Sequence, residues 1–354
     1  MIARGRFVVD THIHAQRHAF KFKERGIKPD FARLAEGMTE VEVYDNTPRL
    51  LYDMERYHVD MCVIQPAFGM TDELNAEIVK ARPDKFVSLC VGTAYMTKVR
   101  KKEIQWSTEG ICEELDRLLA TGLYVGIGEG LPRDRTRRKP HAWEERFEEI
   151  CEIMKIAKKY KVAVGYHTGT ISGYGGARRE LGLGLSSNEW GNPLLAHDIA
   201  TEFPDVPIIM QHGGMQGWWS EKFMDDTFQV AAAHANVYLE TGLYWGELYE
   251  KPLRDPNIGV EKLIFGTDWG ASIPQQWVPG FRPGSYADQG RNQGLPAHQV
   301  DYFGWCLRQL ARAANMYDLP QDDLNLILGG NAVRLFSLED KLPYKRLFKE
   351  YLKQ

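Results

Sequence analysis

The chain has 354 residues, of which 44% are apolar, and a formal net charge of -4. A chain of this length and composition can form one large globular domain with a sizeable core. The slightly negative net charge gives no electrostatic basis for binding nucleic acid or an anionic membrane, and no apolar stretch reaches the roughly 20 residues that span a bilayer. We therefore expect neither a nucleic-acid partner nor a membrane partner.

The cysteines and the N-terminal segment indicate the cellular compartment in which the protein is expected. The five cysteines are scattered and form no C-x-x-C pair, so neither a disulfide framework nor a zinc knuckle is expected. The opening "MIARGRFVVD" lacks the continuous apolar core of a signal peptide. These features predict a cytoplasmic protein.

Eight short apolar runs, each bounded by Gly, Pro or charged residues, recur along the chain. Most are separated by amphipathic helical patterns such as "WEERFEEICEIMKIAKKY" at 143–160. Strands alternating with helices indicate parallel βαβ units, and eight such units predict an α/β fold of the (β/α)8 TIM barrel type. A doubly wound sheet is the alternative, but no glycine-rich dinucleotide fingerprint follows the first run. The runs are 7–14, 61–67, 86–92, 124–130, 162–169, 206–214, 237–242 and 263–270.

We predict a single domain over residues 1–354, because no shift in composition marks a boundary. Three longer segments interrupt the alternation, near 15–47, 170–195 and 271–297, and each follows a predicted strand. Barrel enzymes build their active sites at the C-terminal ends of the strands. We therefore expect these long loops to wall a pocket at that face.

The first predicted strand carries polar side chains inside an apolar run, "VVDTHIH" at 8–14. Alternate residues of a strand share a face, so Asp10, His12 and His14 are expected to project together. The two imidazoles would then be close enough to bind one metal ion. A pair of buried histidines satisfied by hydrogen bonds would give the same pattern.

Four other predicted strands also end in an ionisable residue, namely Glu129, His167, His212 and Asp268. At one face of one barrel these side chains converge on the axis. Buried charges are costly unless they are paired or bound to a metal. The convergence therefore predicts a site for one or two divalent ions, and histidines with carboxylates suit zinc, manganese or iron.

The order His12-x-His14, His167, His212 and Asp268 resembles the amidohydrolase superfamily. The stretches "NPLLAHDIATEFPDVPIIMQHGG" (192–214) and "LILGGNAVRLFSL" (326–338) are similar to its amidohydrolase-related branch, which includes aminocarboxymuconate-semialdehyde decarboxylase and resorcylate-type decarboxylases. The resemblance extends from residue 7 to about 338. It implies a metal-dependent barrel enzyme with a small-molecule substrate, which forms homo-oligomers or assembles with a related subunit.

The resemblance also implies a role for each residue. His12, His14, His167 and Asp268 would be metal ligands, and His212 would polarise the substrate, move a proton or bind a second ion. Asp268 would orient or deprotonate a metal-bound water, which a divalent cation makes acidic. Asp268 and His212 are therefore the expected catalytic residues.

Glu129 departs from the pattern of the single-metal decarboxylases. In "VGIGEG" it resembles the strand-four glutamate with which other members of the superfamily bridge two ions. A hydrogen-bonding role near the site, or a position outside the pocket, is the alternative. In a regular strand Val125, Ile127 and Glu129 share one face, and an inward face would take the carboxylate to the barrel mouth.

The leading functional prediction is decarboxylation, or related hydrolysis or hydration, of a small carboxylate-bearing substrate. If Glu129 bridges two redox-active ions, the alternative is a dinuclear iron or manganese–iron oxygenase. A third hypothesis is an inactive barrel that serves as a partner subunit, since fold alone does not imply function. Arg17, Arg178 and Arg179 are available to hold a carboxylate, and Glu240 is expected to have a structural or substrate-binding role.

Overall fold

The computed structural model describes most of the chain outside the predicted insertions. Most of 15–47 and 170–195 and all of 271–297 lie outside the described residues, as do Arg178, Arg179 and the side chain of Arg17. The described residues are 7–18, 43–67, 70–134, 136, 142–168, 192–215, 220–242, 244–270 and 301–340.

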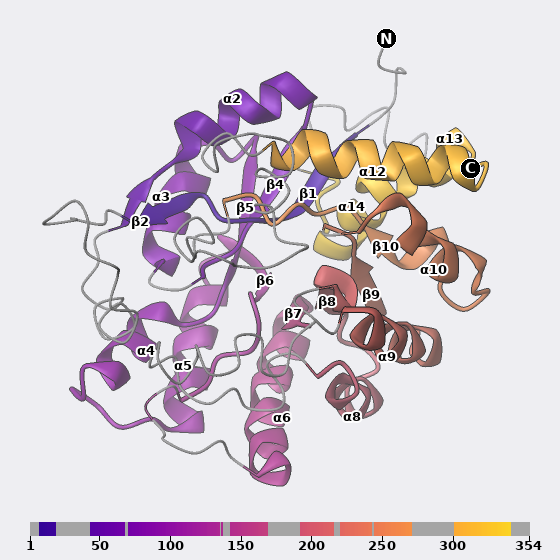
Figure 1. Cartoon of the computed structure of the whole chain (residues 1–354). Coiled ribbons are helices and arrows are strands. Elements are labelled where there is room, and N and C mark those ends of the chain that lie inside the picture. Colours follow the sequence, from indigo (N-terminus) through magenta and orange to yellow (C-terminus); the bar gives the residue numbers. More distant parts are fainter. Residues whose placement is uncertain are drawn as a thin grey trace, which may run out of the picture.

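Eight parallel strands form a barrel, which confirms the predicted (β/α)8 architecture (Figure 1). The ring closes beside the first strand, where Ile13 forms a parallel bridge with Trp269 and the Thr11 N–H donates to the Phe265 carbonyl at 3.0 Å. Each strand pairs with the next in the order β1 (Val9–Ile13), β4 (Met61–Ile64), β5 (Phe86–Cys90), β6 (Tyr124–Ile127), β7 (Ala163–His167), β8 (Ile208–Gln211), β9 (Val237–Glu240) and β10 (Leu263–Ile264).

Helices surround the strands (Figure 1). The predicted helix at 143–160 is observed with those bounds and buries Ile150, Met154 and Ala157. No described helix combines the length and the apolar character needed to cross a membrane. The α-helices are α2 (Thr47–Tyr57), α3 (Asp72–Ala81), α4 (Thr93–Arg100), α5 (Thr108–Leu119), α6 (Trp143–Tyr160), α8 (Leu195–Glu202), α9 (Ser220–Ala233), α10 (Glu250–Arg254), α12 (Tyr302–Met316), α13 (Gln321–Asn325) and α14 (Asn331–Phe336).

Shorter elements complete the described chain. The antiparallel pair β2 (Gln16–His18) and β3 (Val43–Asp45) lies at the two ends of the first insertion, and the sequence analysis did not predict it. The described residues contain three 3-10 turns, η2 (His212–Gly214), η3 (Gly246–Tyr249) and η4 (Val260–Lys262), and one π-helical turn, η7 (Leu326–Gly330).

The interior of the barrel is apolar at the N-terminal ends of the strands. Residues near the strand starts, together with three from α14, form one buried cluster, which we call the barrel floor. Outward-facing residues of the same strands pack against the helices in a second, larger cluster. The floor comprises mainly Val9, Met61, Val63, Val87, Leu89, Ala163, Ile209, Ile264, Ala332, Val333 and Phe336.

Strand β1 departs from regular alternation. Val9 belongs to the floor, whereas Ile13 packs in the outer cluster, although four residues of regular strand would put both on one face. The register against β4 shifts between Asp10 and Ile13, as in a β-bulge, where one strand holds an extra residue. The shift turns His12 and His14 toward the C-terminal mouth of the barrel.

Asp10 does not share the surroundings of the two histidine rings, contrary to the expectation from alternation. Its carboxylate accepts a hydrogen bond from the His12 backbone N–H at 2.9 Å and others from the backbone N–H and hydroxyl of Thr267. Asp10 therefore ties β1 to the segment that follows β10.

Candidate metal centre

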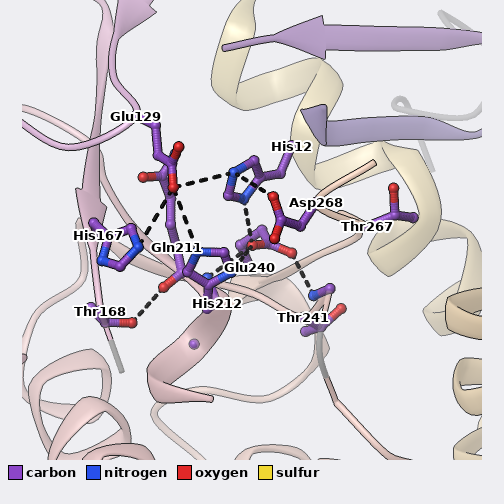
Figure 2. Close-up of polar contacts among 12 residues, drawn as sticks. His12, Glu129, His167, Thr168, Gln211, His212, Glu240, Thr241, Thr267 and Asp268 are labelled. Atoms are coloured by element: carbon purple, nitrogen blue, oxygen red, sulfur yellow. Dashed lines mark hydrogen bonds and ion pairs between the residues drawn. The ribbon is translucent and has the colours of Figure 1, made fainter. Parts of the chain in front are cut away.

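Among the described residues, seven ionisable side chains meet at the C-terminal mouth of the barrel, and Figure 2 labels all of them except His14. Each is buried or nearly so, and Glu129 and Asp268 are the most exposed, at 12% and 9% of the side chain. The six residues predicted as ligands or catalytic groups are all brought together here. The set is His12 and His14 on and after β1, Glu129 after β6, His167 on β7, His212 after β8, Glu240 on β9 and Asp268 after β10.

Glu129 lies between the four histidines. Its Oε1 is 3.7 Å from Nε2 of His12 and 3.6 Å from Nε2 of both His167 and His212. Its Oε2 is 3.5 Å from Nε2 of His14. Two groups of three side chains, each compact enough to hold an ion, share this glutamate: His12 and His14 in one, His167 and His212 in the other.

Strand alternation does not explain the position of Glu129. Ile127, on the face expected to be shared with it, packs in the outer cluster between strands and helices. Strand β6 ends at Ile127, so the carboxylate reaches the mouth from the turn that follows. The Gly130 N–H donates to Oε1 of Gln211 at 3.2 Å and fastens this turn to β8.

Asp268 faces the histidines of the first group. Its Oδ1 is 3.2 Å from Nε2 of His14 and 3.7 Å from Nε2 of His12. Asp268 and His212 both have positive φ angles, 52° and 60°, which cost non-glycine residues of order 1–3 kcal/mol each. Such conformations persist where the surrounding structure imposes them, and they often occur in functional sites.

Some ring nitrogens of these histidines have no hydrogen-bond partner among the described residues. These are Nε2 of His12 and both Nδ1 and Nε2 of His212, all of them buried. A buried polar atom without a partner costs about 1–3 kcal/mol, and a divalent cation would supply that partner. Imidazoles with carboxylates suit zinc, manganese or iron better than magnesium or calcium, so these residues fit the predicted ion.

The charges in the site compensate one another. Burial would raise the pKa of Glu129, but the contact with His212 and the charges of His14 and His12 hold it well below its ordinary value. Burial would lower the pKa of His212, but the contact with Glu129 and the charges of Asp268 and Glu240 raise it to about 9. Protons on imidazoles thus balance the carboxylates, and a bound cation would take over that role.

Comparison with known proteins identifies the family of the chain. The model of the amidohydrolase protein family matches residues 9–338 of the chain. The chain belongs to the amidohydrolase family. No curated protein matches this amidohydrolase.

Two solved structures are similar to this amidohydrolase along nearly their whole length. A probable 2-pyrone-4,6-dicarboxylic acid hydrolase from Acinetobacter baumannii, with citric acid bound, has a TM-score of 0.53 and 11% identity, covering 93% of this chain and 99% of its own. An amidohydrolase from Burkholderia multivorans has a TM-score of 0.53 and 10% identity, covering 94% of this chain and 99% of its own. At these identities the likeness concerns the fold and not the substrate.

The sequence analysis missed two glutamines of this amidohydrolase. Nε2 of Gln211, at the end of β8, donates to Oε1 of Gln65, which follows β4 on the opposite side of the barrel. Nε2 of Gln65 donates in turn to the Thr11 carbonyl at 2.8 Å. Both glutamines are fully buried polar residues at the ends of apolar strands, the same signal that identified the histidines. Their amides cross-link the barrel where the apolar floor gives way to the ionisable groups.

Proposed function

We propose that this amidohydrolase is a divalent-metal-dependent enzyme, similar to the decarboxylase-containing branch, that decarboxylates, hydrolyses or hydrates a small carboxylate-bearing substrate. The supporting observation is the convergence of four histidines with Glu129 and Asp268, in which buried nitrogens of His12 and His212 have no hydrogen-bond partner among the described residues. A bound divalent cation supplies Lewis acidity and lowers the pKa of water from 15.7 to roughly 7.

Asp268 is the candidate proton acceptor. Burial would raise its pKa, but the contact with His14 and the charges of His12 and His212 lower it. The carboxylate is therefore ionised at neutral pH and able to take a proton from water or substrate. Its exposure, small but greater than that of the histidines around it, leaves it accessible from the mouth.

His212 is the candidate proton donor and substrate-orienting group. Its Nε2 lies 3.6 Å from Glu129 and is not otherwise engaged among the described residues. Its backbone N–H donates to Oε2 of Glu240 at 2.9 Å, which holds the ring against the site. A proton carried by this imidazole can move to an atom bound at the mouth.

Metal removal tests the proposal directly. The purified protein is expected to contain zinc, manganese or iron, and chelation should abolish turnover that readdition of the ion restores. Small mono- and dicarboxylic acids are the first compounds to assay, for release of CO2 or for hydrolysis, since the Acinetobacter neighbour is named for a dicarboxylic acid hydrolase. Full turnover by metal-free protein would contradict the proposal.

A dinuclear iron or manganese–iron oxygenase is the second candidate. The observation that favours it is the position of Glu129 in two of the three candidate groups of ligands among the described residues, because paired ions about 3.5–4 Å apart share a ligand. Two ions per chain, with iron or manganese among them, and substrate-dependent oxygen uptake would support this candidate. One ion per chain and no oxygen uptake would eliminate it.

We further propose that the chain assembles with copies of itself or with a related subunit, as the resemblance to the branch implies. Sedimentation or light scattering on purified protein would test this. A chain that binds no metal alone or in its assembly would instead be the inactive partner subunit.

A further inference from the structure

Glu240 is a carboxylate buried beneath two of the candidate ligands (Figure 2). Its Oε2 accepts a hydrogen bond from Nδ1 of His12 at 3.0 Å and another from the backbone N–H of His212 at 2.9 Å. The opposite edge of the His12 ring, at Nε2, faces Glu129 and Asp268. Glu240 therefore binds His12 through Nδ1 and leaves Nε2, the nitrogen that would face an ion, available.

The backbone around Glu240 leaves room for this carboxylate. The Gly242 N–H donates to its Oε1. A Cβ atom on Gly242 or on Gly266 would collide with the same oxygen. Two residues without side chains thus leave the space that this carboxylate occupies.

The two histidines of β1 are held differently. Nδ1 of His14 is hydrogen-bonded to the neutral backbone carbonyl of Gln65 at 2.9 Å, whereas Nδ1 of His12 is hydrogen-bonded to the carboxylate of Glu240. Both partners are acceptors, so each ring donates from Nδ1, and with a cation bound each would present its Nε2 lone pair to the ion. A carboxylate partner also raises the basicity of the ligating nitrogen, which distinguishes His12 from His14.

We infer that Glu240 is a positioning residue that fixes the Nδ1–H tautomer of His12 and makes it the stronger ligand of the β1 pair. Through the His212 N–H, the same carboxylate fixes one ligand from each of the two groups that share Glu129. The inference rests on the proposed metal-dependent function, and it adds a residue that acts through ligands without touching the ion.

Cobalt(II) titration of the metal-free protein tests the inference. Glu240→Gln keeps the size of the side chain but removes the charge, and cobalt should bind about 10- to 100-fold more weakly, as expected for the loss of a ligand-orienting partner. The visible absorption of bound cobalt should also change, because the His12 donor is altered. A merely structural role would not change the spectrum of the bound ion.

Asp72→Asn is the matched control. Asp72 is also a fully buried carboxylate that accepts backbone hydrogen bonds, from Val91 at 3.1 Å and Thr93 at 2.6 Å, and its hydrogen-bond partners among the described residues include no imidazole. This variant should keep the cobalt affinity and spectrum of the wild type. If Glu240→Gln also keeps both, the inference about Glu240 is wrong although the proposed function stands. If the wild type binds no cobalt, the proposed function itself fails.

A measurement on the wild type covers the case in which Glu240→Gln does not fold. Nitrogen-15 NMR of histidine-labelled, zinc-loaded protein reports which ring nitrogen carries the proton. The signal absent from the His12→Asn spectrum belongs to His12 and should show the proton on Nδ1. A proton on Nε2 would overturn the inference.

Discussion

The floor and the mouth of the barrel are built from the same strands a few residues apart, yet they have opposite chemistry. At the floor, Val9, Met61 and Ile264 pack with α14 in an apolar cluster. At the mouth, the ends of β1, β6, β7, β8 and β10 carry imidazoles or carboxylates, and some of the ring nitrogens have no hydrogen-bond partner among the described residues. The contrast indicates that packing at the floor provides the stability that allows the mouth to hold unsatisfied groups and positive φ angles. Changes at the two ends should therefore have separable effects.

Loss of the β1 ligands should have the largest effect. Replacing both His12 and His14 with Ala is expected to remove the bound metal and all metal-dependent turnover, while the floor keeps the barrel folded. Elemental analysis of the double variant measures the bound metal, and circular dichroism measures whether the barrel is folded. Stoichiometric metal in the double variant would show that β1 does not supply ligands.

Asp268→Asn should have the next largest effect. The amide cannot accept a proton as the carboxylate does, so turnover should fall by about 10²- to 10⁴-fold, the range typical of a positioned proton-transfer group. The fold should be retained, because Asp268 lies at the mouth. Steady-state rates on a substrate turned over by the wild type measure the loss, and a near-normal rate would exclude Asp268 from the mechanism.

A substitution at the barrel floor should lower stability and leave the metal content unchanged. Met61 is fully buried in the floor, so Met61→Ala should reduce the free energy of unfolding by about 2–5 kcal/mol. Metal content at a temperature where the variant is folded should match the wild type. Urea unfolding with elemental analysis tests this, and loss of metal from folded protein would show that floor and mouth are coupled.

The smallest effect concerns a buried carboxylate away from the histidines. Burial raises the pKa of Asp72 to about 6, and hydrogen bonds from Thr93 and Val91 offset this only in part. The folded state then holds the proton more tightly than the unfolded chain, whose aspartate pKa is about 3.9. This contribution to stability is complete below about pH 4 and is lost as the pH rises through about 6.

Asp72→Asn replaces the carboxyl with an amide that does not titrate. Comparison of the wild type with this variant therefore isolates the pH-dependent contribution of Asp72 to stability. Relative to the variant, the wild type should lose at most about 3 kcal/mol of unfolding free energy between pH 4 and pH 7. Urea unfolding of both proteins across this range measures the difference. A difference that stays constant with pH would show that Asp72 ionises as freely in the folded protein as in the unfolded chain.

The sequence predicted what depends on local pattern. Apolar runs alternating with amphipathic helices gave the barrel, and ionisable residues at the strand ends located the site. The pattern could not reveal departures from regular alternation. Asp10 was expected beside His12 and is instead hydrogen-bonded to Thr267, because the register of β1 shifts.

The contacts among the site residues also could not be predicted from the sequence of each strand taken separately. Glu129 reaches the histidines from a turn, and no periodicity describes a turn. Glu240 could be recognised as an acid at a strand end, but its contact with His12 joins β9 to β1 across 228 positions in the sequence. Only the closed barrel brings such positions together.

The extra residue in β1 makes the site depend on chain length as well as on residue type. Asp10 and Ile13 are three positions apart, while their partners Cys62 and Ile64 on β4 are two apart. If the two histidines were grafted onto a regularly paired strand with Val9 facing inward, both rings would point toward the surrounding helices. Transplanting this site into another barrel therefore requires copying the irregular pairing together with the motif.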